Sequence, residues 1–106
     1  MRVNFIALIP AYNEEQVIGQ TIASLRKAGL KAKDIYVIND ASSDRTGEIL
    51  SDLGVNVVTN KANLGKAGGV TNALRIIFST SRHKDLTHIC FLDADTLVDP
   101  MYFRVM

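Results

Sequence analysis

The sequence predicts an α/β fold in which an open, mainly parallel sheet is flanked by helices. Two observations lead to this prediction. Short and nearly continuous apolar runs alternate along the chain with longer segments whose apolar residues recur every three or four positions. Strands that are apolar on both faces are typical of a parallel sheet that helices cover on both sides.

The predicted strands are four apolar runs that are rich in Val, Ile, Leu and Phe. They are Val3 to Ile9, Ile35 to Ile38, Val55 to Val58 and Ile89 to Leu92. Most of these runs lack the regular alternation of apolar and polar residues that marks a strand with one face in water. We therefore expect them to form a single buried sheet.

The first predicted helix begins near Asn13 and ends at Gly29. Asn13 and Gln16 resemble a capping box, and a glycine suits the end of a helix. The apolar stripe of this helix consists of Val17, Ile18, Ile22 and Leu25. A stripe with this spacing faces the sheet.

Two further helices are predicted between the later runs. One starts around Ser43 and stops at Gly54, with Asp44 and Arg45 as helix-start residues. The other follows Gly65. The apolar faces are Ile49, Leu50 and Leu53 in the former, and Val70, Ala73, Leu74, Ile77 and Phe78 in the latter. Strand and helix thus alternate as βαβαβαβ, which predicts a Rossmann-like sheet in one domain over residues 1–106.

Composition excludes several classes of function. Of the 106 residues 47% are hydrophobic, and 12 basic against 11 acidic residues leave a net charge of +1. Such a balance predicts no nucleic-acid partner. No apolar stretch approaches the roughly 18 to 20 residues of a membrane span, so we expect the chain to be soluble as it stands. The single cysteine, Cys90, is expected to be a small core residue.

Polar residues follow each predicted strand. They lie in the segments Pro10 to Glu15, Asn39 to Asp44, Asn63 to Gly69 and Asp93 to Asp95. In an open parallel sheet, ligands bind beyond the carboxyl ends of the strands. The pattern therefore predicts one crevice that is lined by all of these segments and that takes a nucleotide-like ligand.

Asp93 and Asp95 flank Ala94 at the end of the last run. Two carboxylates in this place can present oxygens to Mg²⁺ or Mn²⁺, and such a cation would bridge the diphosphate of a nucleotide-sugar. The alternative is that one of them merely caps the following turn. We favour the metal hypothesis because three other polar segments converge on the same crevice.

Four segments resemble, in the right order, the motifs of glycosyltransferase family 2. They are Ile9 to Glu15, Val37 to Thr46, Asn63 to Gly69 and Phe91 to Thr96. The family consists of inverting nucleotide-sugar transferases with the GT-A fold, and the resemblance covers Val3 to Pro100. Leu97 stands where the dolichol-phosphate-mannose-synthase-like branch has Gln, so the resemblance favours the polysaccharide-synthase-like branch.

The resemblance implies a set of nucleotide-sugar-binding residues. They are Pro10, Ala11, Tyr12, Glu14, Asp40, Lys66, Asp93, Ala94 and Asp95. Pro10, Tyr12 and Glu14 would line the base and ribose pocket, with Tyr12 stacking on the base. Asp40 would accept a hydrogen bond from the base, which is uracil in most such enzymes.

The remaining roles concern the phosphates and the metal. The resemblance places Lys66 near the phosphates and Asp93 at the ribose or sugar. Asp95 would ligate the divalent metal, with Asp93 as a second ligand. Two positions depart from the family pattern, since Asn39 replaces an acidic residue and Ala41 replaces the usual Gly.

The function that the resemblance implies is sugar transfer from a nucleotide-sugar, with UDP-sugar favoured, to the hydroxyl of an unknown acceptor. In the family, the catalytic base and the acceptor half lie downstream of the D-x-D motif. We therefore assign no catalytic residue within residues 1–106 and expect the chain alone to be inactive. We expect a cytoplasmic chain, which meets the cytoplasmic face of a membrane only through parts of a longer parent.

Two alternatives stay open on the sequence alone. Haloacid-dehalogenase-like phosphatases use a D-x-D-x-T-L segment, and residues 93–97 read Asp-Ala-Asp-Thr-Leu. Asp93 would then be the phosphoryl nucleophile and Asp95 the general acid, which leaves the three upstream segments unexplained. The second alternative is a non-catalytic nucleotide-binding domain that uses the same crevice.

Overall fold

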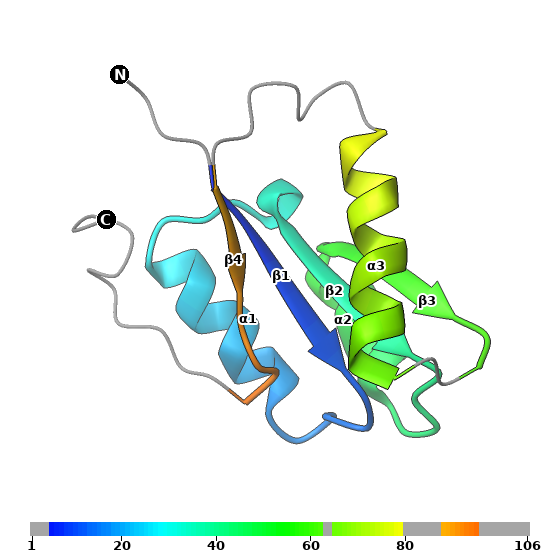
Figure 1. The fold of residues 1–106 in the computed structure, drawn as a ribbon. Helices are drawn as coiled ribbons and strands as arrows, with labels where there is room; N and C mark the ends of the chain where they lie inside the picture. The colour runs from blue at the N-terminus through cyan, green and yellow to red at the C-terminus, as the bar shows by residue number, and fades with distance from the viewer. Residues whose placement is uncertain (1–4, 63–64, 80–87, 96–106) are drawn as a thin grey trace.

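The chain folds as a parallel sheet between two layers of helix. A computed structural model describes residues 5–62, 65–79 and 88–95. The strands are β1 (Phe5–Ala11), β2 (Ile35–Asp40), β3 (Asn56–Asn60) and β4 (His88–Phe91). They form a four-stranded sheet in the order β3-β2-β1-β4, and every pair is parallel (Figure 1).

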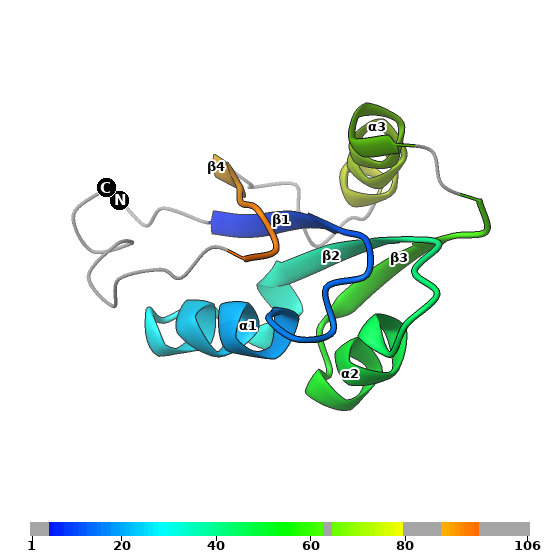
Figure 2. The same ribbon diagram turned by 90° about the horizontal axis from the view of Figure 1, so that it is seen from below.

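The helices lie on both faces of this sheet. Helices α1 (Ile18–Lys27) and α2 (Thr46–Leu53) cover one face, and α3 (Gly65–Phe78) lies on the other (Figure 2). A short 3₁₀ helix, η1 (Ala32–Asp34), leads into β2. The predicted α/β architecture is therefore confirmed, and only residues 3 and 4 of the predicted strands lie outside the described residues.

Burial explains why the apolar runs become strands. All six residues of β2 are buried, because α1 and α2 pack against one face of the strand and α3 against the other. Burying one Ile, Leu or Val side chain contributes about 1.5–3 kcal/mol. Cys90 of β4 is also buried, as predicted, and burial raises the pKa of its thiol.

The start of the first helix differs from the prediction. Helix α1 begins at Ile18, and no side chain caps its N-terminus. The predicted capping box is wrong because Asn13 uses its side chain elsewhere: its Oδ1 accepts hydrogen bonds from the backbone N–H groups of Ser43 and Asp44.

The end of α3 also departs from the prediction. Ala73 and Ile77 are buried against the sheet, as expected, but Phe78 is 66% exposed. Each residue of a helix is rotated by about 100° from the one before it. Ile77 occupies the sheet-facing position in the last turn, so Phe78 points away from the core.

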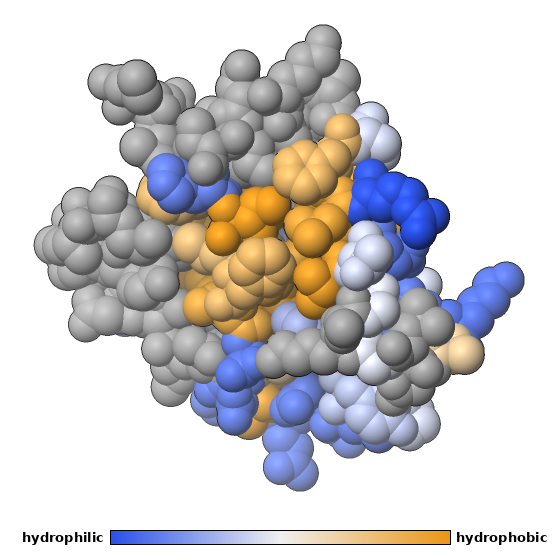
Figure 3. All heavy atoms as spheres, in the orientation of Figure 1, coloured by the Kyte–Doolittle hydropathy of each residue, from blue (hydrophilic) through white to orange (hydrophobic). Residues whose placement is uncertain are grey.

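One face of the domain presents apolar side chains on its surface. Figure 3 shows hydrophobic residues gathered at the centre of the face that carries β1, β4 and α3. The exposed large side chains on these elements include Phe91 of β4 and Ile76 of α3. Within residues 5–62, 65–79 and 88–95, no helix combines the length and the hydropathy needed to cross a membrane.

Candidate functional site

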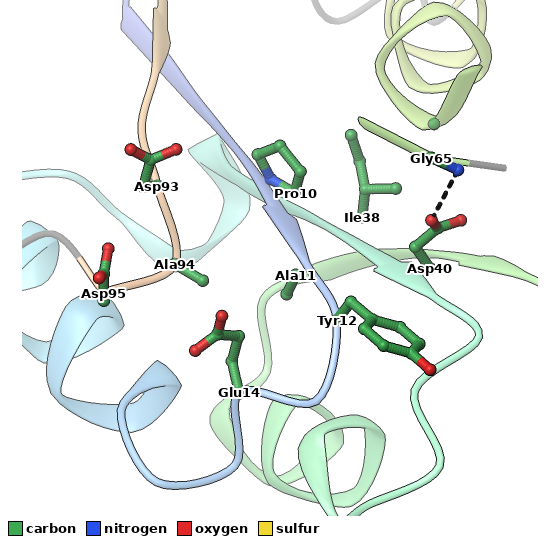
Figure 4. A pocket seen from close by; sticks show the side chains of 11 residues that line it. Pro10, Ala11, Tyr12, Glu14, Ile38, Asp40, Gly65, Asp93, Ala94 and Asp95 are labelled. Atoms are coloured by element: carbon green, nitrogen blue, oxygen red, sulfur yellow. Dashed lines mark hydrogen bonds between the residues drawn. The ribbon is translucent and has the colours of Figure 1, made fainter. Parts of the chain in front are cut away.

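A pocket of about 360 Å³ lies at the carboxyl ends of β1, β2 and β4 (Figure 4). Its lining consists of Pro10, Ala11, Tyr12, Glu14, Ile38, Asp40, Gly65, Gly69, Asp93, Ala94 and Asp95. Strand order explains its place. The chain passes from β1 to β2 on one side, while β4, which comes last in the sequence, lies on the other side of β1. Ligand crevices of open α/β sheets lie at the strand ends where the strand order reverses in this way.

The pocket brings together eight of the nine predicted site residues: Pro10, Ala11, Tyr12, Glu14, Asp40, Asp93, Ala94 and Asp95. The ninth, Lys66, lies in the first turn of α3, but its side chain is outside the described residues. The expectation of one shared crevice is thus met for all four polar segments, the third of which contributes Gly65 and Gly69. The ligand that these residues bind stays a prediction.

The two sides of the pocket differ in chemistry. Figure 4 shows Asp93 and Asp95 on the side of β4, with the Glu14 carboxylate directed toward them. On the opposite side, Tyr12 and Asp40 lie at the ends of β1 and β2. The Tyr12 side chain is 49% exposed, so its ring has an accessible face. The pocket therefore has an acidic side and a side that combines an aromatic ring with a carboxylate.

Hydrogen bonds from Asn60 and Gly65 help to hold Asp40 in place. Its Oδ1 accepts from the Nδ2 of Asn60 at 2.9 Å, and its Oδ2 accepts from the backbone N–H of Gly65 at 3.1 Å. Asp40 and Asn60 are each 6% exposed. The carboxylate thus links the ends of β2 and β3 to the start of α3.

The structure explains why Gly65 and Gly69 of the third polar segment are glycines. Gly65 has a φ of +74°, a conformation that glycine reaches without steric cost, and this turn aims its N–H at Asp40. A Cβ on Gly69 would lie 3.1 Å from Ile38 and 3.4 Å from Asn60. Glycine at position 69 therefore lets α3 approach the end of β2 closely.

Asn39, which departs from the family pattern, does not line the pocket. Neighbouring residues of a strand point to opposite faces, so Asn39 points away from the side of Asp40. Its side-chain oxygen accepts the N–H of Ser42 at 3.2 Å. A Cβ on Gly47 of α2 would lie 2.9 Å from the Asn39 amide nitrogen. The change at position 39 thus affects packing against α2 and leaves the pocket lining unchanged.

Ala41, the other departure, has a φ of 62°. Side chains with a Cβ are strained in this left-handed region by roughly 1–2 kcal/mol. We therefore expect Ala41→Gly to raise the free energy of unfolding by about 1 kcal/mol, as measured by urea denaturation. The matched control is Ala23→Gly on the exposed side of α1, which should lower it by about 1 kcal/mol. A destabilised Ala41→Gly variant would contradict this account.

The loop after β1 is hydrogen-bonded to the loop after β2, and Asn13 is central to this contact. Its Oδ1 accepts from the N–H groups of Ser43 and Asp44 at 2.8 and 3.3 Å. Its own N–H donates to the Ser42 hydroxyl at 3.0 Å. Asn13 has a φ of 54°, which asparagine adopts more readily than most residues. This conformation turns the chain back toward the second loop.

Thr46, the first residue of α2, completes the same contact. Its buried hydroxyl accepts the Glu14 N–H at 2.9 Å and donates to the Asp44 carboxylate at 2.5 Å. The second Asp44 oxygen accepts the Glu15 N–H at 3.2 Å. We call these contacts between residues 13–15 and 42–46 the loop clamp. Because Tyr12 and Glu14 lie on either side of Asn13, the loop clamp fixes two residues of the pocket.

The charge of Asp44 is part of the loop clamp. Partial burial acts to raise the pKa of the Asp44 carboxyl, but hydrogen bonds from Thr46 and Glu15 outweigh it and hold the pKa below its ordinary value. The ionised Asp44 carboxylate therefore stabilises the folded state. This contribution is complete above the ordinary pKa of an aspartate, and it is lost as the pH falls through the lowered pKa of the folded state. We therefore expect the loop clamp to be intact at neutral pH.

Thr21 of α1 anchors the acidic side of the pocket. Its fully buried hydroxyl donates a hydrogen bond to the backbone carbonyl of Ala94. This contact ties the turn between Asp93 and Asp95 to the helix beneath it. The carboxylates on either side therefore extend from a backbone that is held in place.

The acidic side fits a cation that is shared with a ligand. Asp93 and Asp95 are both exposed, so water and phosphate oxygens can reach them. In the part of the chain that the structure describes, no group of three or more His, Cys, Asp or Glu side chains could hold a metal ion alone. Mg²⁺ is commonly bound by one or two carboxylates together with substrate phosphates and waters. The donors present match this pattern.

Sequence reasoning missed three supporting residues, which are Thr21, Thr46 and Asn60. Thr21 had a signal, because it is a polar residue on the apolar stripe of the first helix, and such residues need a buried partner. Asn60 also had a signal, because it is a polar residue just after the predicted strand Val55 to Val58, as the other pocket segments follow their strands. The contact of Thr46 with Glu14 had no local signal, since the two residues are 32 positions apart.

Comparison with known proteins places the chain in a family. Residues 6–106 match the model described as glycosyl transferase family 2. The poly-beta-1,6-N-acetyl-D-glucosamine synthase of Staphylococcus epidermidis is 31% identical over 96 residues, covering 87% of this chain and 22% of the synthase. The probable glycosyltransferase YdaM of Bacillus subtilis is 38% identical over 109 residues, covering 93% of this chain and 25% of YdaM. The chain spans about a quarter of the length of these relatives.

Solved structures share the fold. The crystal structure of S. aureus TarS 1-349 in complex with UDP-GlcNAc has a TM-score of 0.76 and 20% identity, covering 97% of this chain and 30% of that one. The complex of the same protein with UDP has a TM-score of 0.68 and 23% identity, covering 88% of this chain and 28% of the TarS chain.

The family match also decides between the two enzyme hypotheses. It includes the three upstream segments that the phosphatase hypothesis leaves unexplained, so that hypothesis is not retained. A match over nearly the whole chain, a shared fold and relatives named as glycosyltransferases show that this chain belongs to glycosyltransferase family 2, as a polysaccharide-synthase-like domain.

Proposed function

We propose that this chain supplies the donor-binding half of a glycosyltransferase that moves a sugar from a UDP-sugar to an acceptor hydroxyl. The observation that carries the proposal is the pocket with its two unlike sides. An aromatic ring beside a carboxylate suits a base with an N–H donor, and the acidic side suits a metal-bound diphosphate. The UDP and UDP-GlcNAc complexes of TarS, which shares the fold, support the choice of uridine.

In this proposal the residues of the chain bind and orient the donor. Tyr12 stacks on the base and Asp40 accepts its N–H, while Pro10, Ala11 and Glu14 line the base and ribose pocket. Asp93 contacts the ribose or sugar, with Ala94 beside it, and Lys66 lies near the phosphates. The acceptor oxygen forms a bond to the anomeric carbon as the bond from that carbon to the diphosphate breaks, and UDP leaves with the electron pair. The base that takes the acceptor proton is assigned to no residue of this chain.

The divalent metal belongs to the same proposal. Asp95 would hold Mg²⁺ or Mn²⁺, with Asp93 as a second ligand, and the cation would neutralise the charge that develops on the departing diphosphate. Two exposed carboxylates at the pocket edge support this role. A non-catalytic nucleotide-binding domain would use the same pocket, but membership of a transferase family favours the enzyme.

Isothermal titration calorimetry with UDP, GDP and ADP in the presence of Mn²⁺ tests the nucleotide. We expect UDP to bind at least about tenfold more tightly than the purine nucleotides, because a pocket that hydrogen-bonds one base leaves polar groups unpaired with another. All affinities should be weak, because part of the binding surface is expected to lie outside the chain. A clear preference for ADP would reject the role given to Asp40.

Tyr12 offers a matched pair of variants for the same titration. Tyr12→Ala removes the stacking surface and should weaken UDP binding by about tenfold, since stacking of one base on an aromatic side chain contributes about 1–3 kcal/mol. Tyr12→Phe keeps the ring and should bind UDP as the wild type does. Equal affinity of the Ala and Phe variants would show that Tyr12 does not stack on the base.

A further inference from the structure

The two donors that hold Asp40 have a consequence for which base the pocket accepts. Asn60 donates to one carboxylate oxygen at 2.9 Å and the Gly65 N–H donates to the other at 3.1 Å. Hydrogen bonds donated to a carboxylate favour its ionised form. An ionised carboxylate is an acceptor only and cannot donate a hydrogen bond to a ligand.

The orientation of the Asn60 amide is fixed by a third residue. Asn72 of α3 donates from its Nδ2 to the Oδ1 of Asn60 at 3.4 Å. The amide nitrogen of Asn60 is therefore directed at Asp40, and its oxygen at Asn72. Because Asn60 is buried, turning the amide over would set its oxygen against the Asp40 carboxylate, which is unfavourable.

We infer that Asn60 is a selectivity-determining residue, which keeps Asp40 as an acceptor and thereby makes the pocket choose uracil over cytosine. The inference rests on the proposed function, in which Asp40 faces the base. Uracil presents a ring N–H at the position where cytosine presents an unprotonated nitrogen. An acceptor-only Asp40 accepts a hydrogen bond from the ring N–H of uracil. With cytosine, the carboxylate oxygen and the unprotonated ring nitrogen are both acceptors and cannot pair. Asn60 acts through Asp40, as a positioning residue.

Asn60→Asp tests this with little change of shape. A second carboxylate beside Asp40 makes the pair share a proton, because two adjacent like charges do not both ionise readily. Asp40 then gains the capacity to donate to cytosine. Titration calorimetry of the wild type should show UDP binding at least about tenfold more tightly than CDP. In Asn60→Asp this ratio should fall to about threefold or less.

Two further variants keep the test decisive. Asn60→Ala removes the donor without adding a charge and should also lower the ratio of UDP to CDP affinity. The matched control is Asn56→Asp, the same change at the other end of β3, where the side chain contacts the carbonyls of Lys33 and Ile35. This control should keep the wild-type ratio.

The outcomes separate this inference from the proposed function. If the wild type prefers UDP and the Asn60 variants weaken both nucleotides equally, Asn60 is only a structural support and the inference is wrong, while the proposed function stands. If the wild type binds UDP and CDP equally, the role of Asp40 in base recognition fails as well. If it binds neither, both the proposed function and the inference fail.

Discussion

Substituting Asp95 by asparagine is expected to remove the metal-dependent part of UDP affinity while leaving the fold intact. In the wild type, we expect Mn²⁺ to strengthen UDP binding at least about tenfold, which corresponds to about 1.4 kcal/mol. Asn keeps the shape of Asp95 but removes the charge that a hard cation prefers. Because Asp95 is exposed at the pocket edge, the change disturbs no packing.

Calorimetry with UDP in Mn²⁺ and in EDTA measures this effect directly. The wild type should lose affinity in EDTA, and Asp95→Asn should show the same weak binding in both conditions. Asp52→Asn, which removes an exposed carboxylate from α2 outside the pocket lining, is the matched control and should behave as the wild type does. Equal UDP affinity of the wild type in Mn²⁺ and EDTA would remove the metal from the proposal.

Thr46→Val is expected to lower the free energy of unfolding by about 1–3 kcal/mol, the cost of leaving buried polar groups without a partner. Valine has nearly the same shape, but it cannot accept the Glu14 N–H or donate to Asp44. The loop that carries Tyr12 and Glu14 then loses part of the loop clamp. We therefore also expect weaker UDP binding at temperatures where the variant is fully folded.

Thr46→Ser distinguishes the contribution of the hydroxyl from that of the methyl group. Serine keeps the donor and the acceptor, so it should restore most of the UDP affinity even if it restores less of the stability. Urea denaturation and calorimetry on the same samples measure the two effects. A Val variant with wild-type stability and wild-type affinity would show that the loop clamp does not hold the pocket.

Much of the fold was predictable because buried strands and helix faces require apolar residues at characteristic spacings in the local sequence. The run Ile35 to Ile38 has to be a doubly buried strand, and the stripe of Ile18, Ile22 and Leu25 has to face a sheet. Helix ends were harder to predict, because capping depends on which donors are near in space. Asn13 has the composition of a cap, yet its oxygen meets the N–H groups of Ser43 and Asp44.

The pocket lining was predictable for a similar reason, while its supports were not. The ends of parallel strands meet at one edge, so Tyr12, Asp40 and Asp95 could be brought together from their order alone. The hydrogen bonds that hold them join residues far apart in the chain, such as Thr21 with Ala94. No local pattern specifies such a pair, since a hydroxyl such as that of Thr21 could donate to many other backbone carbonyls of the chain.

The sheet order also predicts an order of events in folding. β1 pairs with β2 and β2 with β3, so these three strands can associate through connections of moderate length. Among the residues that the structure describes, β4 pairs with β1 alone, and the chain from α1 to α3 lies between these two strands in the sequence. Contacts between distant segments carry a larger loop-closure cost and form late. During synthesis, which delivers the N-terminus first, the side of Tyr12 and Asp40 should therefore be assembled before β4 adds Asp93 and Asp95.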